Sequence, residues 1–281
     1  MALKTRIIPC LLLRNGLIVR SEEFRYHQII GDPITQLSRY NQWLVDELIY
    51  LDISGDAGGG HDVRRADAQI ATSGKTDIVD IIAEISRHCF VPLTVGGGIR
   101  SLDDMKLRFA NGADKVAINT AAIENPELIT QAAEAFGAQA VVVSIDAKRL
   151  DSGHYAVYKG GREETALDPA LWAAEVTRRG AGEIILNSID RDGRACGYDL
   201  DLVSRVSDAT DVPLIAIGGC GRWEDMVHVI RAGGANAVAA ANIFHFTEMS
   251  YRAAKRHLSA SGIEVRMPYP SPEGRPRLRR R

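Results

Sequence analysis

Residues suited to proton transfer follow two apolar runs in the second half of the chain. Asp146 ends the run AVVVSID and is followed by Lys148, while EIILNSID is followed by Asp192 and Gly193. Acid and base catalysis on one ligand usually needs two titratable groups on opposite sides of the reacting atoms. The pattern predicts Asp146 as one of these groups, with a structural carboxylate that binds backbone N–H groups as the alternative.

Glycine-rich turns follow two further apolar runs, VPLTV and VPLIAI. Without a Cβ atom, backbone N–H groups can approach a phosphate closely. Because the two turns are related by an internal repeat, they suit an elongated ligand with a phosphate at each end, and tight turns without a ligand are the other interpretation. The predicted phosphate- and substrate-binding set is Gly97, Gly98, Thr120, Lys148, Asp192, Gly193, Gly218, Gly219 and Asn242.

The internal repeat joins the two halves of the chain. TVGGGI and ADKVAINT in the first half return as AIGGCG and ANAVAAAN in the second, with one common offset. Overlaying RIIPCLL on AVVVSID puts Leu12 opposite Asp146, so the first strand is expected to end in a leucine where its repeat ends in an acid. Leu12 cannot move a proton, and Asp52 or Asp192 would have to replace it.

Charged residues stand where four of the predicted strands begin, at the end opposite to the glycine turns. Isolated charges at such positions normally extend to solvent. Two acids and two bases on neighbouring and opposite strands could instead form a closed ring of ion pairs, as a structural plug or a gate. The pattern alone favours the plug. The four residues are Arg6, Glu47, Lys115 and Glu183.

Eight short apolar runs alternate with helix-like segments along the chain. Near-continuous apolar strands are typical of a parallel sheet buried on both faces, so the pattern predicts a single α/β domain, a (β/α)₈ TIM barrel with a two-fold half-barrel repeat. Its active site is expected at the strand C-termini. The barrel is assigned to residues 1–265, and a basic tail rich in proline and arginine to 266–281, which we expect to be disordered. Long loops are predicted at 20–33 and 54–75.

Composition excludes several other classes of protein. The net charge of -2 over 281 residues provides no overall field that would attract nucleic acid or an anionic membrane. No apolar run approaches the roughly 20 residues of a membrane span, and no signal-peptide pattern opens the chain. The four cysteines are widely spaced without a CxxC pair. We therefore expect a cytoplasmic protein with no metal and no cofactor.

Several motifs resemble one family over about residues 4–265, among them GGGI, ADKVAINTAAIENP, QAVVVSIDAKR, RGAGEIILNSIDRDG and IFHF. The chain resembles the cyclase subunit of imidazole glycerol phosphate synthase, which forms a heterodimer with a glutaminase subunit and receives ammonia from it. The resemblance implies a ribulosyl aminoimidazole carboxamide nucleotide with two phosphates as the ligand, and glutaminase docking near Asp114. It also implies that ammonia enters past the four charged residues, which reverses the preference for a plug and favours an ammonia gate.

The departures from the family lie at the other end of the strands. Where the family has a catalytic aspartate in a CLD pattern, this chain reads Cys10-Leu11-Leu12, and Arg20 and Ile217 replace a lysine and a hydrogen-bonding residue. A divergent branch of the family, associated with surface-polysaccharide gene sets, also reads IPCLLL. That branch is thought to pass ammonia to a third protein, an acceptor enzyme that converts an acetamido sugar into an acetamidino sugar. The resemblance favours this role, with cyclase activity lost.

Three other functions are kept as alternatives. The first is an authentic cyclase of histidine biosynthesis, with Asp146 as the sole acid and base and a neighbouring carboxylate replacing the function missing at Leu12. The second is a non-catalytic scaffold that only holds and activates the glutaminase. A phosphosugar isomerase is the least favoured, because the four charged residues would have no purpose there.

Overall fold

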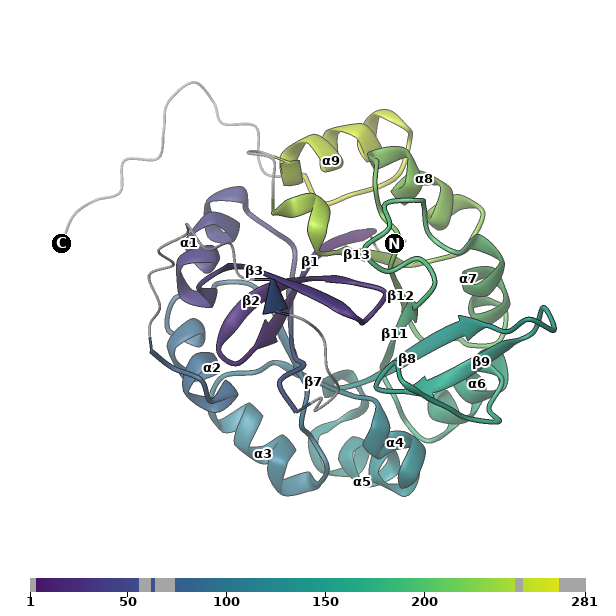
Figure 1. Cartoon of the computed structure of the whole chain (residues 1–281), viewed down its shortest axis with the longest axis horizontal. Helices are drawn as coiled ribbons and strands as arrows, with labels where there is room; N and C mark the ends of the chain where they lie inside the picture. Colours follow the sequence, from purple (N-terminus) through teal and green to yellow (C-terminus); the bar gives the residue numbers. More distant parts are fainter. Residues whose placement is uncertain (1–3, 56–61, 64–73, 246–249, 268–281) are drawn as a thin grey trace.

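Eight parallel strands close into a barrel in the computed structural model, which describes residues 4–55, 62–63, 74–245 and 250–267. The last strand pairs with the first, Arg6 opposite Ala237, and this pairing closes the sheet (Figure 1). The fold is therefore the predicted (β/α)₈ barrel. In spatial order the barrel strands are β1 (Arg6–Arg14), β4 (Leu48–Asp52), β6 (Leu93–Gly96), β7 (Lys115–Ile118), β8 (Val141–Arg149), β11 (Glu183–Ser188), β12 (Leu214–Ile217) and β13 (Ala237–Ala240).

Helices surround the barrel on its outer side (Figure 1). Their apolar faces pack on the strands, and buried aspartates such as Asp32 cap helix N-termini by accepting backbone N–H bonds. The helices are α1 (Pro33–Trp43), α2 (Ile78–Ser86), α3 (Leu102–Ala110), α4 (Thr120–Glu124), α5 (Glu127–Phe136), α6 (Pro169–Arg178), α7 (Leu200–Ser207), α8 (Trp223–Arg231) and α9 (Ser250–Ala260), with the 3₁₀ turns η1 (Ala138–Ala140) and η2 (Asn242–Phe244).

The half-barrel repeat is present, but its two segment pairs do not share one offset. The bounds of β6 and β12 put Leu93 opposite Leu214, whereas those of β7 and β13 put Lys115 opposite Ala237. The second offset is one residue larger because the connection from α8 to β13 is one residue longer than that from α3 to β7. Gly97 and Gly98 therefore match Gly218 and Gly219, and all four have positive φ angles.

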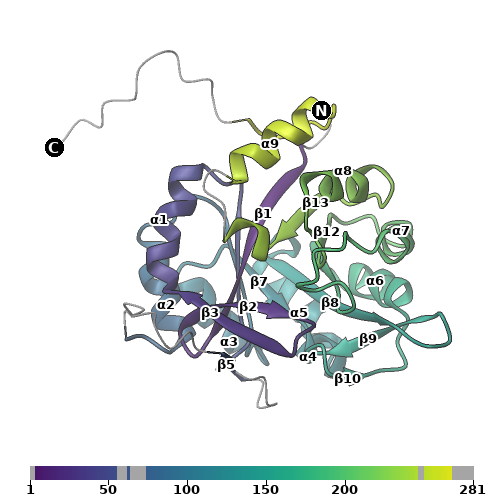
Figure 2. The same cartoon turned by 45° about the horizontal axis from the view of Figure 1, so that its top comes forward.

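Two antiparallel extensions at the strand C-termini were not predicted. The segment expected as a long loop at 20–33 instead forms β2 (Leu17–Glu22) and β3 (Tyr26–Gly31), which continue from β1 as a meander. The strand β9 (Tyr155–Lys159) pairs with the extension of β8 and with β10 (Glu163–Glu164). Both extensions lie at one end of the barrel, while β1 begins at the other (Figure 2).

These extensions correct the prediction that the first strand ends at Leu12. Both β1 and β8 run past Leu12 and Asp146, and the two residues lie on the barrel wall where the strands leave it. Most of the predicted loop at 54–75, apart from β5 (Asp62–Val63), and all but the first two residues of the predicted tail at 266–281 lie outside the described residues.

Candidate functional site

A cavity of about 670 Å³ opens at the C-terminal ends of the barrel strands. Of the residues predicted from sequence, Lys148 does not line this cavity and lies on the extension of β8 toward β9. The predicted residues that do line it are Leu12, Gly97, Gly98, Thr120, Asp146, Asp192, Gly193, Gly218, Gly219 and Asn242. The structure therefore collects residues from seven barrel strands, or from the turns that follow them, at one mouth.

Asp146 is held in a buried hydrogen-bonded position on the cavity wall. Its Oδ2 accepts a hydrogen bond from the Asn119 side-chain amide at 3.0 Å, and Asn119 Oδ1 accepts one from the Gly160 N–H at 3.1 Å. Asn119 thus orients the carboxylate and is fixed by the β9–β10 turn. Asn119 was not predicted from the sequence because it is not titratable, although its position at the end of the ADKVAIN run could have identified it.

The wall opposite Asp146 is apolar. In the register of the sheet, Leu12 on β1 pairs with Leu51 on β4, whereas Asp146 on β8 pairs with Asn187 on β11. Leu12 and Leu51 both line the cavity and pack on the apolar interior of the barrel. The first half of the barrel therefore offers two leucines where the second half offers a carboxylate and an amide.

Two other carboxylates lie near the mouth but are already engaged. Asp52 Oδ1 accepts the Ser54 N–H at 2.9 Å, and Asp192 Oδ2 accepts the Ser21 hydroxyl at 2.9 Å. Burial raises the pKa of the Asp192 carboxyl above its usual value, against the lowering effect of the Ser21 hydrogen bond. Of the two, Asp192 is the one whose carboxyl pKa is raised.

Two glycine turns form paired cradles on opposite sides of the mouth. At Gly97 the φ angle is +99°, and a Cβ atom would lie 2.0 Å from the Asp52 carbonyl oxygen. At Gly218 the φ angle is +94°, and a Cβ atom would lie 2.7 Å from Asn187 Oδ1. Only glycine fits such positions, because both turns pack closely against the end of a neighbouring strand. Thr120 and Asn242 begin α4 and η2 beside the same cavity.

The β2–β3 hairpin covers part of the mouth and is hydrogen-bonded to its far wall. The Glu23 N–H donates to the Asp192 carbonyl at 3.1 Å, and Asn242 Nδ2 donates to the Ser21 carbonyl at 3.2 Å. Arg194 adds an ion pair to Glu23 at 3.1 Å. In Figure 1 the hairpin crosses the opening of the barrel, which leaves the cavity partly closed toward solvent.

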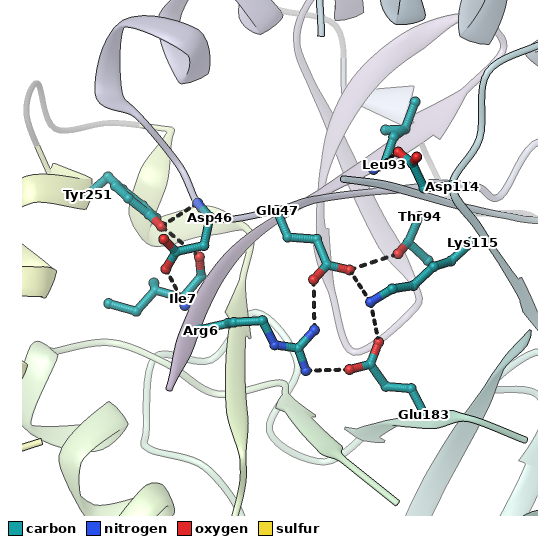
Figure 3. Close-up of polar contacts among 10 residues, drawn as sticks. All are labelled: Arg6, Ile7, Asp46, Glu47, Leu93, Thr94, Asp114, Lys115, Glu183 and Tyr251. Carbon is teal, nitrogen blue, oxygen red and sulfur yellow. Dashed lines mark hydrogen bonds and ion pairs between the residues drawn. The ribbon is translucent and has the colours of Figure 1, made fainter. Parts of the chain in front are cut away.

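The four charged residues at the strand N-termini form a closed ring (Figure 3). Arg6 contacts Glu47 at 2.7 Å and also Glu183, while Lys115 contacts both acids at 2.8 Å. Each of the four carboxylate oxygens therefore faces one cation, and the Thr94 hydroxyl donates a further bond to Glu47 at 3.1 Å. The ring inferred from sequence is formed, although Glu47 lies one residue before β4 rather than within it.

Mutual neutralisation keeps this ring charged despite its burial. Burial alone would raise the pKa of Glu47, but Lys115 and Arg6 together lower it below the usual carboxyl value. Burial would likewise lower the pKa of Arg6, and the two carboxylates raise it. Desolvation is thus offset by ion pairs and hydrogen bonds, the arrangement that a buried charge requires.

An apolar column connects the ring to the cavity. Its sides are aliphatic residues of the barrel strands that alternate inward along each strand, up to Leu12, Leu51 and Ile217 at the mouth. The remaining members of this interior cluster are Ile8, Cys10, Ile49, Ala117, Val142, Ile185, Ile215, Ala237 and Ala239. The two polar regions of the barrel are therefore separated by an interior without charge.

Asp114 lies beside the ring on the outer face of the barrel. It is exposed, and its Oδ2 accepts the Leu93 N–H at 2.8 Å (Figure 3).

Within the described ranges, no group of three or more His, Cys, Asp or Glu side chains is placed to hold a metal ion. No helix in the part of the chain that the structure describes is long and apolar enough to cross a membrane.

The fold and the mouth together define the class of (β/α)₈ barrels, with a cavity at the strand C-termini that two glycine turns border. The family model described as histidine biosynthesis protein matches residues 6–250. The chain belongs to this family and, within it, to the HisF family.

Two relatives show the extent of the similarity. The imidazole glycerol phosphate synthase subunit HisF of Caulobacter vibrioides is 45% identical over 267 residues, with 94% of this chain and 97% of the relative covered. The subunit of the same name from Natranaerobius thermophilus is 40% identical over 265 residues, with 94% and 100% covered. The alignments therefore span nearly the whole of both relatives.

Proposed function

We propose that this chain binds a glutaminase subunit at the strand N-termini and conducts ammonia through the barrel to the mouth. The observation that carries the proposal is the ring of Arg6, Glu47, Lys115 and Glu183, whose ion pairs close one end of an apolar column that leads to a ligand-sized cavity. In this proposal Asp114, exposed beside the ring, belongs to the docking face. The relatives are named as subunits, which agrees with a barrel that works in a complex.

Neutral ammonia is the species that this interior can carry. An ammonium ion would lose its hydration in the apolar column at a large cost in free energy, whereas uncharged ammonia would lose far less. Passage requires that at least one ion pair of the ring separates, so the ring acts as a gate. Separation exposes a charged group at the rim rather than in the column, because both cations are partly accessible there, Arg6 at 23% and Lys115 at 19%.

The mouth supports delivery of ammonia better than the cyclisation of a nucleotide. Cyclisation needs proton transfer at two sides of the ligand, and the repeat partner of Asp146 is Leu12, an alkyl group on an apolar wall. We infer that the ammonia leaves for an acceptor enzyme that converts an acetamido sugar of a surface polysaccharide into an acetamidino sugar. The resemblance of IPCLLL to the divergent branch of the family supports this assignment.

The alternative is an authentic cyclase of histidine biosynthesis. Identity of 45% and 40% to HisF subunits and the intact pair of glycine cradles favour it. In that case Asp146 acts as one acid or base, and the partly buried Asp192 replaces the function absent at Leu12. A scaffold that only activates the glutaminase would leave the ring closed as a plug.

The acceptor can be identified with labelled nitrogen. The chain and its glutaminase are supplied with [amide-¹⁵N]glutamine and excess unlabelled ammonium, together with either the bisphosphate nucleotide or the acetamido sugar and its amidating enzyme. We expect ¹⁵N-enriched amidine and no labelled imidazole product. Labelled imidazole would establish the cyclase alternative. Amidine with the isotope ratio of the bulk ammonium would show that ammonia is not conducted through the barrel, and the scaffold alternative would remain.

A further inference from the structure

A second polar cluster lies directly behind the ring, on the outer side of β1 and β4. Asp46, which precedes Glu47, is buried at 5% exposure, and its Oδ2 accepts the Ile7 N–H at 3.3 Å. Ile7 follows Arg6. Because neighbouring residues of an extended chain point to opposite sides, Asp46 and Ile7 face outward where Glu47 and Arg6 face the ring (Figure 3).

Tyr251 of α9 joins the same two residues. Its hydroxyl accepts the Asp46 N–H at 2.8 Å and donates to the Ile7 carbonyl at 2.9 Å, and the side chain is fully buried. A single hydroxyl therefore links the backbone beside Arg6 to the backbone beside Glu47. Any relative movement of these two strand ends stretches one of its hydrogen bonds.

Lys255 completes the cluster one helical turn later. Its Nζ lies 2.7 Å from Asp46 Oδ1, donates to the Arg266 carbonyl at 2.5 Å and stands 5.0 Å from the centre of the Tyr251 ring. Both partners of this ion pair are buried. A buried ion pair adds little net stability compared with packed apolar residues, so its presence here calls for a role in fixing geometry.

We propose that Tyr251, with Asp46 and Lys255, is a positioning device that holds Arg6 and Glu47 at the ion-pair distance of the closed ring. The device lies outside the ring and touches none of the four ring side chains directly. Its importance for ammonia rests on the proposed function, whereas its effect on ring geometry does not. On the opposite side of the ring, Asp114 makes the comparable bond to the Leu93 N–H, next to Thr94 and Lys115, from an exposed position.

The test compares two buried tyrosines in the full chain. Tyr251→Phe removes the hydroxyl behind the ring, while Tyr198→Phe removes a buried hydroxyl that donates to the Ala239 carbonyl at 3.0 Å instead of to Ile7 beside Arg6. Acetylation of Lys115 by acetic anhydride, followed by mass spectrometry, reports how often the ring opens. Lys106, exposed on α3, is the internal reference in each sample.

Tyr251→Phe should raise the acetylation rate of Lys115 relative to Lys106 by about fivefold, the change in an equilibrium that one net hydrogen bond represents. Tyr198→Phe should leave this ratio unchanged, even if it lowers the midpoint of urea unfolding as much as Tyr251→Phe does. Equal ratios in both variants would overturn the proposal, and so would a rise at Lys159 on β9 as large as that at Lys115, since Lys159 is similarly exposed, lies outside the device and would show general loosening.

Failure of the gate and failure of the positioning device give different results. In the complex with the glutaminase, Lys115→Met tests the gate through the transfer of ¹⁵N from glutamine to the acceptor. Unchanged transfer would refute the role of the ring as a gate. The effect of Tyr251→Phe on the geometry of the ring would still be decided by the acetylation of Lys115.

Discussion

The two ends of the barrel differ in how completely their charged groups are matched. At the strand N-termini two acids and two bases pair in a closed ring. At the strand C-termini Asp146 is bonded to Asn119, and the opposite wall offers Leu12 and Leu51. At the end that would admit ammonia, every charge of the ring is paired with an opposite charge. At the end that would transform a ligand, Leu12 stands where the repeat partner of Asp146 would be a second acid or base. A barrel of this kind can therefore keep a complete ring of charges at one end while the polar groups at its other end change.

Removing one acid of the ring should have the largest effect on stability. Glu47→Gln leaves Arg6 and Lys115 with an uncompensated charge, and we expect the free energy of unfolding to fall by about 3 kcal/mol. Urea unfolding measures the change. Glu175→Gln is the matched control, because Glu175 pairs with Arg178 and Arg179 at the surface and its loss should have little effect. Equal losses in the two variants would contradict a ring that depends on mutual neutralisation.

A methyl group in a cradle should damage the mouth in a different way. Gly97→Ala forces a Cβ atom against the Asp52 carbonyl at a positive φ angle, and stability should fall by on the order of 2 kcal/mol. At Gly153 the φ angle is +86°, and no atom lies within 4 Å of the position that an added Cβ atom would take. Gly153→Ala should therefore show only the cost of the backbone conformation, roughly 1 kcal/mol. If thermal unfolding finds the same loss in both, steric closure of the cradle is refuted.

The ring should also give the protein a characteristic pH dependence. The pKa of Glu47 is lowered in the folded state, so its contribution is fully present above the usual carboxyl pKa and is lost as the pH falls through the folded value. The urea midpoint of the native chain should therefore fall on acidification from neutral pH to about pH 3. Glu47→Gln should show a smaller fall. A parallel decrease in both proteins would assign the acid sensitivity to other carboxylates.

The smallest expected effect concerns the hairpin at the mouth. Ser21→Ala removes the hydroxyl bonded to Asp192, and local opening of β2 and β3 should become about fivefold more frequent. Hydrogen exchange of the hairpin amides measures this, with Ser38→Ala on the exposed face of α1 as the control. Unchanged protection of the hairpin would show that Ser21 does not hold it closed.

Sequence was a good guide to the barrel and to the ring, because buried parallel strands are continuous apolar runs and the four charges stand where those runs begin. The hairpin of β2 and β3 was missed since a meander that projects beyond the barrel carries polar residues such as SEEFRYHQ and resembles a loop. The one-residue change of offset was missed for another reason. Three glycines can be aligned with two in more than one way, and only strand bounds and φ angles decide.

Asn119 and Lys148 show the limit for the site itself. Sequence can select residues at strand ends, but the direction of a side chain after the strand leaves the barrel depends on the register of the extension. Lys148 lies on such an extension, paired with Ala156, and is absent from the cavity wall. Asn119 is brought to Asp146 by the adjacent strand β7, a contact between residues distant in sequence.

The most direct measurement bypasses the ring altogether. The purified chain receives ammonium and the bisphosphate nucleotide, and loss of the nucleotide is followed for the native protein, Leu12→Asp and the control Leu51→Asp on the neighbouring strand. We expect negligible turnover in the native chain and in Leu51→Asp, with a gain of about a hundredfold or more in Leu12→Asp, the usual contribution of a positioned acid or base. Turnover of the native chain equal to that of Leu12→Asp would refute the loss of cyclase activity and establish an intact cyclase.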